Sequence, residues 1–283
     1  MITIWHRGKV KVNRLLRNPF PRARAMGKLT SRFPYEIMEM IIAHLTRDLD
    51  TLKACSLTCR FWYTVAVPHL HHTLVLGRNG RGVARSELKP LSKLHRLGLM
   101  PLVKEIRVRQ WCGMGGWFVP QAFGRRDLRY FSAFANVQNL VIRRLQLDHF
   151  IPDIERYFGH FSPSLRSIEL FKPRCTPRQL SYFLSLFPNL DDIEVRHIYT
   201  HIPGATTPDA GLSPFSVPKL RGRLTLHSFH WVETWTHFTS CGRLRFRHMD
   251  LRGSASCAPL LLEACAETLE TLRFNAADGT AGE

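Results

Sequence analysis

Residues 165–170 read LRSIEL, and residues 190–195 read LDDIEV. Each stretch has an apolar residue at its first, fourth and sixth positions. In a β-strand, the fourth and sixth side chains point to the same side, and the fifth points to the other. The pattern recurs at Val103-Ile106-Val108, Val137-Leu140-Ile142, Phe246-Met249-Leu251 and Leu269-Leu272-Phe274, and with one extra residue at Leu220-Leu224-Leu226.

The spacing of these seven units indicates a repeat architecture. Their middle positions are 23 to 34 residues apart, close to the period of about 20–29 residues in leucine-rich repeats. One strand with one helix cannot enclose a core, but stacked copies share one. The sequence therefore predicts an α/β fold over residues 101–276, an irregular leucine-rich-repeat-like solenoid with parallel strands. An ordinary α/β domain with coincidental spacing is the alternative.

The fifth position of each unit is expected to face solvent, because it lies between two core-facing residues. This predicts a target-binding surface formed by Arg107, Val141, Glu169, Glu194, Thr225, Asp250 and Arg273. Their mixed charges suit a polar protein partner better than an apolar ligand. The loop at residues 199–216 is expected at the edge of this surface. Residues 277–283 are expected to form a polar tail that lacks a capping helix, which indicates a chain that continues or a partner that covers the last unit.

Apolar residues also recur at helical spacing in two stretches nearer the N-terminus, FPYEIMEMIIAHL (33–45) and TLKACSLTCRFWYTVA (51–66). The first stripe consists of Phe33, Ile37, Ile41 and Leu45, widened by Met38 and Ile42, and the second of Leu52, Cys55, Cys59, Trp62 and Ala66. Pro68 is expected to end the second helix. Short helices bury little surface alone, so the wide first stripe favours a partner. A bundle that only caps the next domain is the competing interpretation.

These residues resemble an F-box. The resemblance rests on Phe33-Pro34-x-Glu36-Ile37, Ile41-Ile42-x-x-Leu45, Leu52 and Cys55-Ser56-Leu57-x-Cys59-Arg60-x-Trp62. Residues 51–74 are similar to F-box proteins of mushroom-forming fungi. The resemblance implies a three-helix F-box at residues 29–76 that docks onto the Skp adaptor of an SCF ubiquitin ligase and, through it, onto cullin, while a separate domain holds the substrate. The residues expected to contact Skp are Phe33, Pro34, Ile37, Ile41, Ile42, Leu45, Leu52, Cys55 and Trp62.

The formal net charge of +18 is concentrated in two segments. Residues 1–35 contain nine Lys and Arg and no acid, residues 78–109 contain nine against two acids, and the remainder is almost balanced. We expect residues 1–28 to form a disordered basic leader, with a nuclear-import patch or a mitochondrial presequence as alternatives. Residues 77–100 are expected to form a linker and a first helix. A nucleic-acid-associated protein that uses these segments, or an orphan repeat scaffold, is the competing function.

Several classes of function lack support in the sequence. The chain has no G-x-S-x-G, H-E-x-x-H or Walker A motif, which predicts no catalytic residues, no cofactor and no enzyme activity. The seven cysteines, at positions 55, 59, 112, 175, 241, 257 and 265, form no C-x-x-C pair, which predicts reduced thiols and no metal site. No apolar run reaches the roughly 18 residues of a membrane span, and no signal peptide is evident. We therefore expect a protein of the cytoplasm or nucleus.

Overall fold

The computed structural model describes residues 34–46, 48–76, 88–109, 130–143, 158–173, 175–197, 219–228, 232–240, 242–253 and 256–275. The chain divides into an N-terminal unit, residues 1–74, and a C-terminal unit, residues 75–283. The expectations for residues 1–28, 77–87, 199–216 and 277–283 and for Phe33 lie outside the described residues. Within the described ranges, no helix has the length and apolar character needed to cross a membrane.

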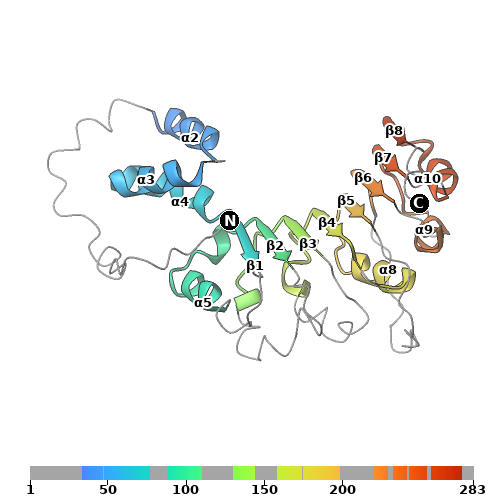
Figure 1. Ribbon diagram of the computed structural model, residues 1–283, viewed down its shortest axis with the longest axis horizontal. Helices are drawn as coiled ribbons and strands as arrows, with labels where there is room; N and C mark the ends of the chain where they lie inside the picture. Colours follow the sequence, from blue (N-terminus) through green and yellow to red (C-terminus); the bar gives the residue numbers. More distant parts are fainter. Residues whose placement is uncertain are drawn as a thin grey trace, which may run out of the picture. The chain divides into compact units, whose positions relative to one another are not determined.

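The described part of the N-terminal unit, from residue 34 on, contains three helices, α2 (Tyr35–His44), α3 (Leu49–Thr58) and α4 (Arg60–Leu70) (Figure 1). Pro34 directly precedes α2, and Glu36 lies in its first turn, where a carboxylate interacts favourably with the helix dipole. Asp48 caps α3, and its carboxylate accepts a hydrogen bond from the Thr51 backbone N–H at 3.0 Å. Local sequence signals therefore account for the starts of the first two helices.

The single helix predicted over residues 51–66 is wrong, because the chain breaks at Cys59. This residue has an extended backbone (φ −157°, ψ 171°), and the Thr58 hydroxyl donates to the Cys55 carbonyl at 2.7 Å. The prediction that Pro68 ends the helix is also wrong. Pro68 lies inside α4, which continues to Leu70, because a proline so near the helix end removes only one backbone hydrogen bond.

Eight strands form one sheet, in which the spatial order equals the sequence order. They are β1 (Thr73–Leu76), β2 (Glu105–Arg109), β3 (Asn139–Arg143), β4 (Ser167–Phe171), β5 (Asp192–Arg196), β6 (Arg223–His227), β7 (His248–Arg252) and β8 (Thr271–Asn275). All neighbouring pairs from β2 to β8 are parallel. The expected α/β fold with parallel strands is confirmed, and β1, which spans the division between the units, is an additional strand.

The described helices of the C-terminal unit are α5 (Leu88–Arg96), α8 (Pro177–Ser185), α9 (Val232–Ser240) and α10 (Ala258–Cys265), with short 3-10 helices at Met100–Leu102 and Gly159–Phe161. Figure 1 shows these four α-helices on one side of the row of strands. A capping box begins α8: the Gln179 N–H donates to the Thr176 hydroxyl, and the Thr176 N–H donates to the Gln179 side chain. The other side of the strands is formed by the alternate residues that are partly or fully exposed, such as Val141, Glu169 and Glu194, and is here called the outer sheet face.

The core of the C-terminal unit follows the repeated pattern. The first, fourth and sixth positions of the first six units are all buried, and aromatic side chains from the helices, such as Phe183 and Trp235, are buried with them. The last unit differs, because Leu272 and Phe274 on β8 are 43% and 49% exposed. The apolar side chains of β8 are therefore more exposed to solvent than the corresponding side chains of β2 to β7.

The residue after each of four successive strands adopts a left-handed backbone. Lys172, His197, Ser228 and Gly253 have φ values between 51° and 59°. The N–H of each donates to the carbonyl of the last residue of the next strand, at 2.8 to 2.9 Å. Because the same bond recurs at β4 to β7, the units share a backbone geometry as well as an apolar pattern.

The repeat unit that contains β6 has one extra residue, which the structure accommodates at Gly222. A Cβ atom added at Gly222 would lie 2.5 Å from an Asp192 carboxylate oxygen and 2.7 Å from the Asp191 carbonyl. That carbonyl accepts the Gly222 N–H at 3.1 Å, and the Asp192 carboxylate accepts the Arg223 N–H at 2.7 Å. Glycine is thus required because the backbones of two neighbouring units approach closely here.

Candidate functional site

The helix α2 presents two adjacent apolar faces. Ile37, Met40 and Ile41 share one face at i, i+3 and i+4 spacing, and their side chains are exposed. Met38 and Ile42 lie on the neighbouring face and are buried. The nearly continuous apolar stripe therefore divides into one face that packs within the unit and one that faces solvent.

Two of the residues expected to contact Skp belong to the core of the N-terminal unit. Ile42 and Leu52 are 0% exposed and pack with Val65 and Ala66. Because neither side chain has exposed surface in the free chain, a contact with a partner would require the unit to rearrange, and their role at a Skp interface stays a prediction. Ile42 and Leu52 pack in the core beneath the exposed face of α2.

The other expected contact residues within the described range have intermediate or high exposure. Pro34, Ile37 and Ile41 are exposed. Leu45, Cys55 and Trp62 are partly buried and pack against the core. The structure therefore brings Pro34, Ile37 and Ile41 to the surface and leaves the remaining three at the boundary between surface and core.

Further exposed apolar side chains were missed by the sequence analysis. Tyr35, Met40, Leu57 and Tyr63 are exposed, and Leu57 reaches 69%. Tyr35 also contacts Phe61 of α4 edge to face, with ring centroids 5.9 Å apart. These residues lie outside the two predicted apolar stripes, so the stripes did not indicate them. The high apolar content of residues 33–63 was the signal available in the sequence. Large apolar side chains exposed together on a small helical unit mark an interaction surface.

The seven residues predicted to bind a target lie in one row across the outer sheet face. Arg107, Val141, Glu169, Glu194, Thr225, Asp250 and Arg273 are successive register partners from β2 to β8. None of them is buried, whereas the flanking residues on β2 to β7 are. The structure therefore places them as the period-two pattern predicts. Their role in binding stays a prediction.

Ion pairs along single strands balance most of the charge on this row. Asp250 accepts two hydrogen bonds from Arg252, at 2.8 and 2.9 Å. Glu194 forms an ion pair with Arg196 on β5, and Glu105 forms an ion pair with Arg107 on β2. Glu169 lies between these strands, and within the described residues it has no ion-pair partner. The row thus offers one uncompensated carboxylate among neutralised neighbours.

A second row on the outer sheet face combines aromatic and cationic side chains. Arg143 lies over the Phe171 ring, 5.9 Å from its centroid, and Lys172 lies 5.6 Å from it. Partial burial, together with the nearby charges of Arg196 and Arg252, lowers the pKa of His227. This imidazole is therefore biased toward its neutral form, in which it can both donate and accept a hydrogen bond.

The described residues contain no group of three or more His, Cys, Asp or Glu side chains arranged to hold a metal ion. Of the cysteines in these ranges, Cys175, Cys257 and Cys265 are buried, Cys55 and Cys59 are partly buried, and all five are free thiols. Burial raises the pKa of Cys257 to about 11, so this thiol is a poor nucleophile near neutral pH. The described residues therefore present two candidate interaction faces, the exposed face of α2 and the outer sheet face.

Comparison with known families places a domain on the first of these faces. Residues 30–77 match the family described as F-box-like. The match contains α2, α3 and α4 with the exposed apolar residues Tyr35, Ile37, Met40, Ile41, Leu57 and Tyr63. No curated protein and no solved structure matches the chain significantly.

Proposed function

We propose that this chain is the substrate-recognition subunit of an SCF-type ubiquitin ligase. The F-box-like domain at residues 30–77 suggests such an adaptor role, and F-box proteins are typically non-enzymatic. In this proposal, α2–α4 dock onto a Skp-type adaptor and through it onto a cullin, and the chain itself performs no covalent chemistry. It would act in the cytoplasm or nucleus.

The exposed apolar face within the F-box-like domain is the observation that carries this proposal. Ile37, Met40 and Ile41 on α2 and Leu57 on α3 are exposed although the unit has its own core. Burying one such side chain against a partner contributes about 1.5–3 kcal/mol. A few well-packed anchors dominate the affinity of most protein interfaces, so this small set is sufficient for specific docking.

The outer sheet face of the C-terminal unit is the proposed target-binding surface. Stacked strand-and-helix units present long surfaces of this kind, and the row from Arg107 to Arg273 carries side chains of both charges. A target held there would be kept near the catalytic arm of the ligase at a high effective concentration. The proposal therefore assigns specificity to the sheet and assembly to the helices.

Capture by a purified Skp-type adaptor tests the docking half of the proposal. Ile41→Asp places a carboxylate on the exposed face, where an interface would bury it without a partner. We expect at least a tenfold loss of capture and an unchanged melting temperature, because Ile41 is 42% exposed in the free chain. Ser92→Asp on α5 adds the same charge at an exposed position and should be captured like the wild type. Undiminished capture of Ile41→Asp would refute the assignment.

A further inference from the structure

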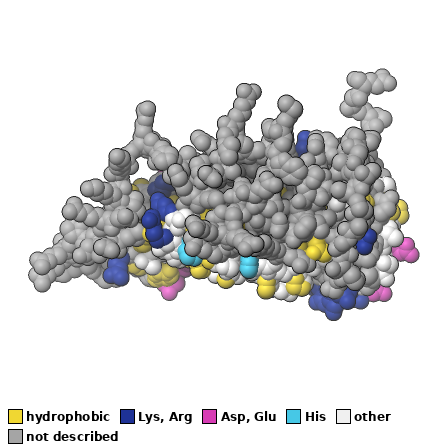
Figure 2. Space-filling view, turned by 90° about the horizontal axis from the view of Figure 1, so that it is seen from below, with side chains coloured by type: hydrophobic (Ala, Val, Ile, Leu, Met, Phe, Trp, Pro, Cys, Tyr) yellow, Lys and Arg dark blue, Asp and Glu magenta, His cyan; other side chains and the backbone are white. Residues whose placement is uncertain are grey.

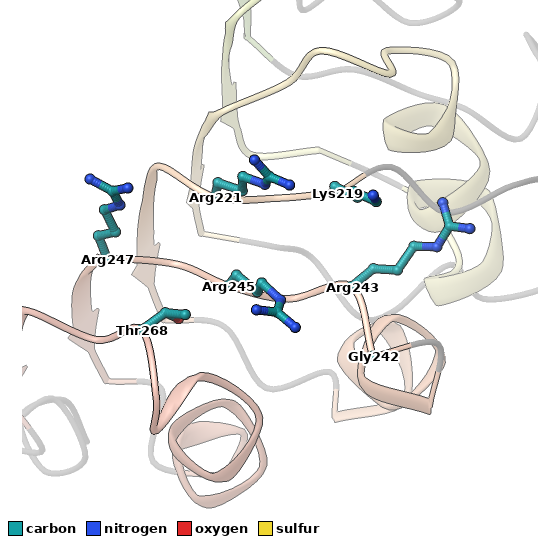
Figure 3. A pocket seen from close by; sticks show the side chains of 7 residues that line it. All are labelled: Lys219, Arg221, Gly242, Arg243, Arg245, Arg247 and Thr268. Carbon is teal, nitrogen blue, oxygen red and sulfur yellow. The ribbon is translucent and has the colours of Figure 1, made fainter.

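A groove of about 490 Å³ lies where the chain enters β6 and β7. Its lining contains Lys219, Arg221, Arg243, Arg245 and Arg247, together with Thr268. Figure 3 shows the cations on two neighbouring segments, Lys219 and Arg221 on one and the three remaining arginines on the other. In the view of Figure 2, Lys and Arg side chains are visible at several places beside the grey atoms. A dense local concentration of positive charge therefore exists in a part of the sequence that is almost neutral overall.

The backbone explains why the cations point to the same side. Leu220 forms a parallel bridge with Leu244: the Leu220 N–H donates to the Arg243 carbonyl at 3.1 Å, and the Arg245 N–H donates to the Leu220 carbonyl at 2.8 Å. Leu220 and Leu244 are buried. In such extended segments alternate side chains point to opposite sides, so the cations beside these leucines all face solvent.

The positive charge is only partly compensated. Glu270 lies 3.7 Å from Arg247, and Asp191 and Asp192 interact with Arg166 and the Arg223 backbone instead. Within the part of the chain that the structure describes, Lys219, Arg221 and Arg245 have no carboxylate partner. All three side chains are exposed. Neighbouring like charges repel, so the cluster weakens rather than stabilises the fold, and a ligand is the better explanation for it.

The spacing of the cations favours an extended ligand. Alternate residues of an extended segment are about 6.6 Å apart, so Arg243 and Arg247 are separated by about 13 Å. Side chains that extend straight from the segment would hold their charges at about this separation, which is more than one small anion spans. An extended polypeptide with an acidic residue at every second position repeats its charge at the same interval of about 6.6 Å.

The lining also argues against a nucleic acid. Single-stranded nucleic acids are bound by aromatic side chains on which the bases stack, in addition to cations. Among the described residues of the groove lining, none is aromatic, and the nearby Trp235 and Phe246 are fully buried. The described lining therefore offers charge without a stacking platform.

We infer that this groove binds an extended acidic polypeptide segment through Lys219, Arg221, Arg243, Arg245 and Arg247. The inference rests on the proposed function in one respect: the acidic segment would belong to a target protein that this chain captures. The site itself does not involve the F-box-like domain. A failure of adaptor capture and a failure of peptide binding are therefore separate results.

Fluorescence anisotropy on the full chain tests the inference with a labelled peptide of about twelve residues that has Glu at every second position. We expect binding that weakens as salt is raised, because exposed charge pairs are screened, and little binding of a matched peptide with Gln in place of Glu. Arg221→Glu with Arg245→Glu should weaken binding at least tenfold. The matched control is Lys93→Glu with Arg178→Glu, two exposed positions on α5 and α8, which should bind within about twofold of the wild type.

The milder pair Arg221→Gln with Arg245→Gln guards against a folding defect. It should keep the circular dichroism spectrum of the wild type and still lose part of the affinity. Three results would overturn the inference: equal binding of the peptide, including no binding, by wild type and groove variants; tighter binding of an oligouridine of the same length; or full displacement of the peptide by inorganic phosphate at concentrations equal to the peptide's.

Discussion

The side-chain amide of Asn189 donates a hydrogen bond to the backbone carbonyl of Pro163, 26 residues earlier in the chain, at 2.9 Å. Asn136 donates in the same way to Pro101, at 2.8 Å. Each asparagine directly precedes the first apolar residue of its repeat unit. Pro101 lies in the 3-10 helix Met100–Leu102 and Pro163 lies in a turn, and each precedes the strand of the neighbouring earlier unit. These side chains therefore tie successive units together, beside the backbone bonds of the sheet.

Loss of this bond should weaken the stacking of units. We expect Asn189→Ala to lower the free energy of unfolding by about 1 kcal/mol, the usual net value of one hydrogen bond. Asn189→Asp should also destabilise, because a carboxylate cannot donate. Urea denaturation followed by circular dichroism measures both. Gln138→Ala, at an exposed position, is the control, and an equal effect of Gln138→Ala and Asn189→Ala would argue against the role of the bond.

The neighbours Ile41 and Ile42 should respond differently to truncation. Ile42 is 0% exposed in the core of the N-terminal unit, so Ile42→Ala should cost about 2–5 kcal/mol and loosen α2. Ile41 is on the exposed face, so Ile41→Ala should cost less than about 1 kcal/mol. Hydrogen exchange of the α2 amides checks the difference. Equal loss of protection in both variants would contradict the division of the helix into two faces.

Charge reversal on the outer sheet face should change target selection without affecting docking. Glu169 and Glu194 are register partners, so Glu169→Lys with Glu194→Lys converts two adjacent carboxylates into cations. We expect mass spectrometry of captured proteins to show a different set of targets and an unchanged yield of the Skp adaptor. Glu263→Lys with Glu267→Lys, exposed on and just after α10, is the control pair. An unchanged set of targets would remove this row from the binding surface.

The cap of α3 predicts a specific acid sensitivity. Hydrogen bonds from Thr51, first from its hydroxyl and then from its N–H, lower the pKa of Asp48 below the ordinary value of 3.8. The carboxylate is therefore favoured in the folded state, and its contribution to stability is complete above 3.8 and lost as the pH falls through that value to the lower folded pKa. Asp48→Asn retains a cap that does not titrate. Denaturation at about pH 6 and about pH 2.5 should show a smaller acid loss in this variant, and equal losses would count against the cap.

Thiol labelling should separate the cysteines by burial. Because burial raises the pKa of Cys257 to about 11, only about one thousandth of it is thiolate at pH 8, and that fraction is shielded from reagent. Burial raises the pKa of Cys265 as well. In native protein we expect iodoacetamide to modify the partly exposed Cys55 and Cys59 first, as followed by mass spectrometry. All of these sites should react in urea. Early modification of Cys257 without denaturant would show that α10 opens readily.

The strands were predictable because their signal is local and repeated. Ile168 and Leu170 flank a polar residue, as do Ile193 and Val195, and the same apolar spacing recurs in all seven units, which leaves one consistent register. The strand Thr73–Leu76 was missed because it has only one such alternation, Leu74 and Leu76, directly after a helical stretch. The break at Cys59 was missed because Leu52, Cys55, Cys59, Trp62 and Ala66 keep helical spacing across it.

The two functional surfaces were less predictable because each depends on what lies beside a residue in space. On α2, Met38 and Ile41 are equally apolar, and only packing against α3 and α4 decides which one is buried. Counting charges along the sequence did not reveal the groove cations, because the chain outside the two basic segments has almost no net charge. Their acidic counterparts, such as Asp191 and Asp192, are engaged elsewhere, so the balance in sequence is not a balance in space.

The identity of spatial and sequence order in the sheet has a consequence for synthesis. Each strand from β3 onward pairs with the strand synthesised just before it, after a connection of about 20 to 30 residues. Bringing together two segments at so short a separation costs little chain entropy. Proteins dominated by contacts of short sequence separation fold fast. The chain can therefore assemble vectorially at the ribosome, each new strand adding to a finished edge, without waiting for any distant segment to emerge.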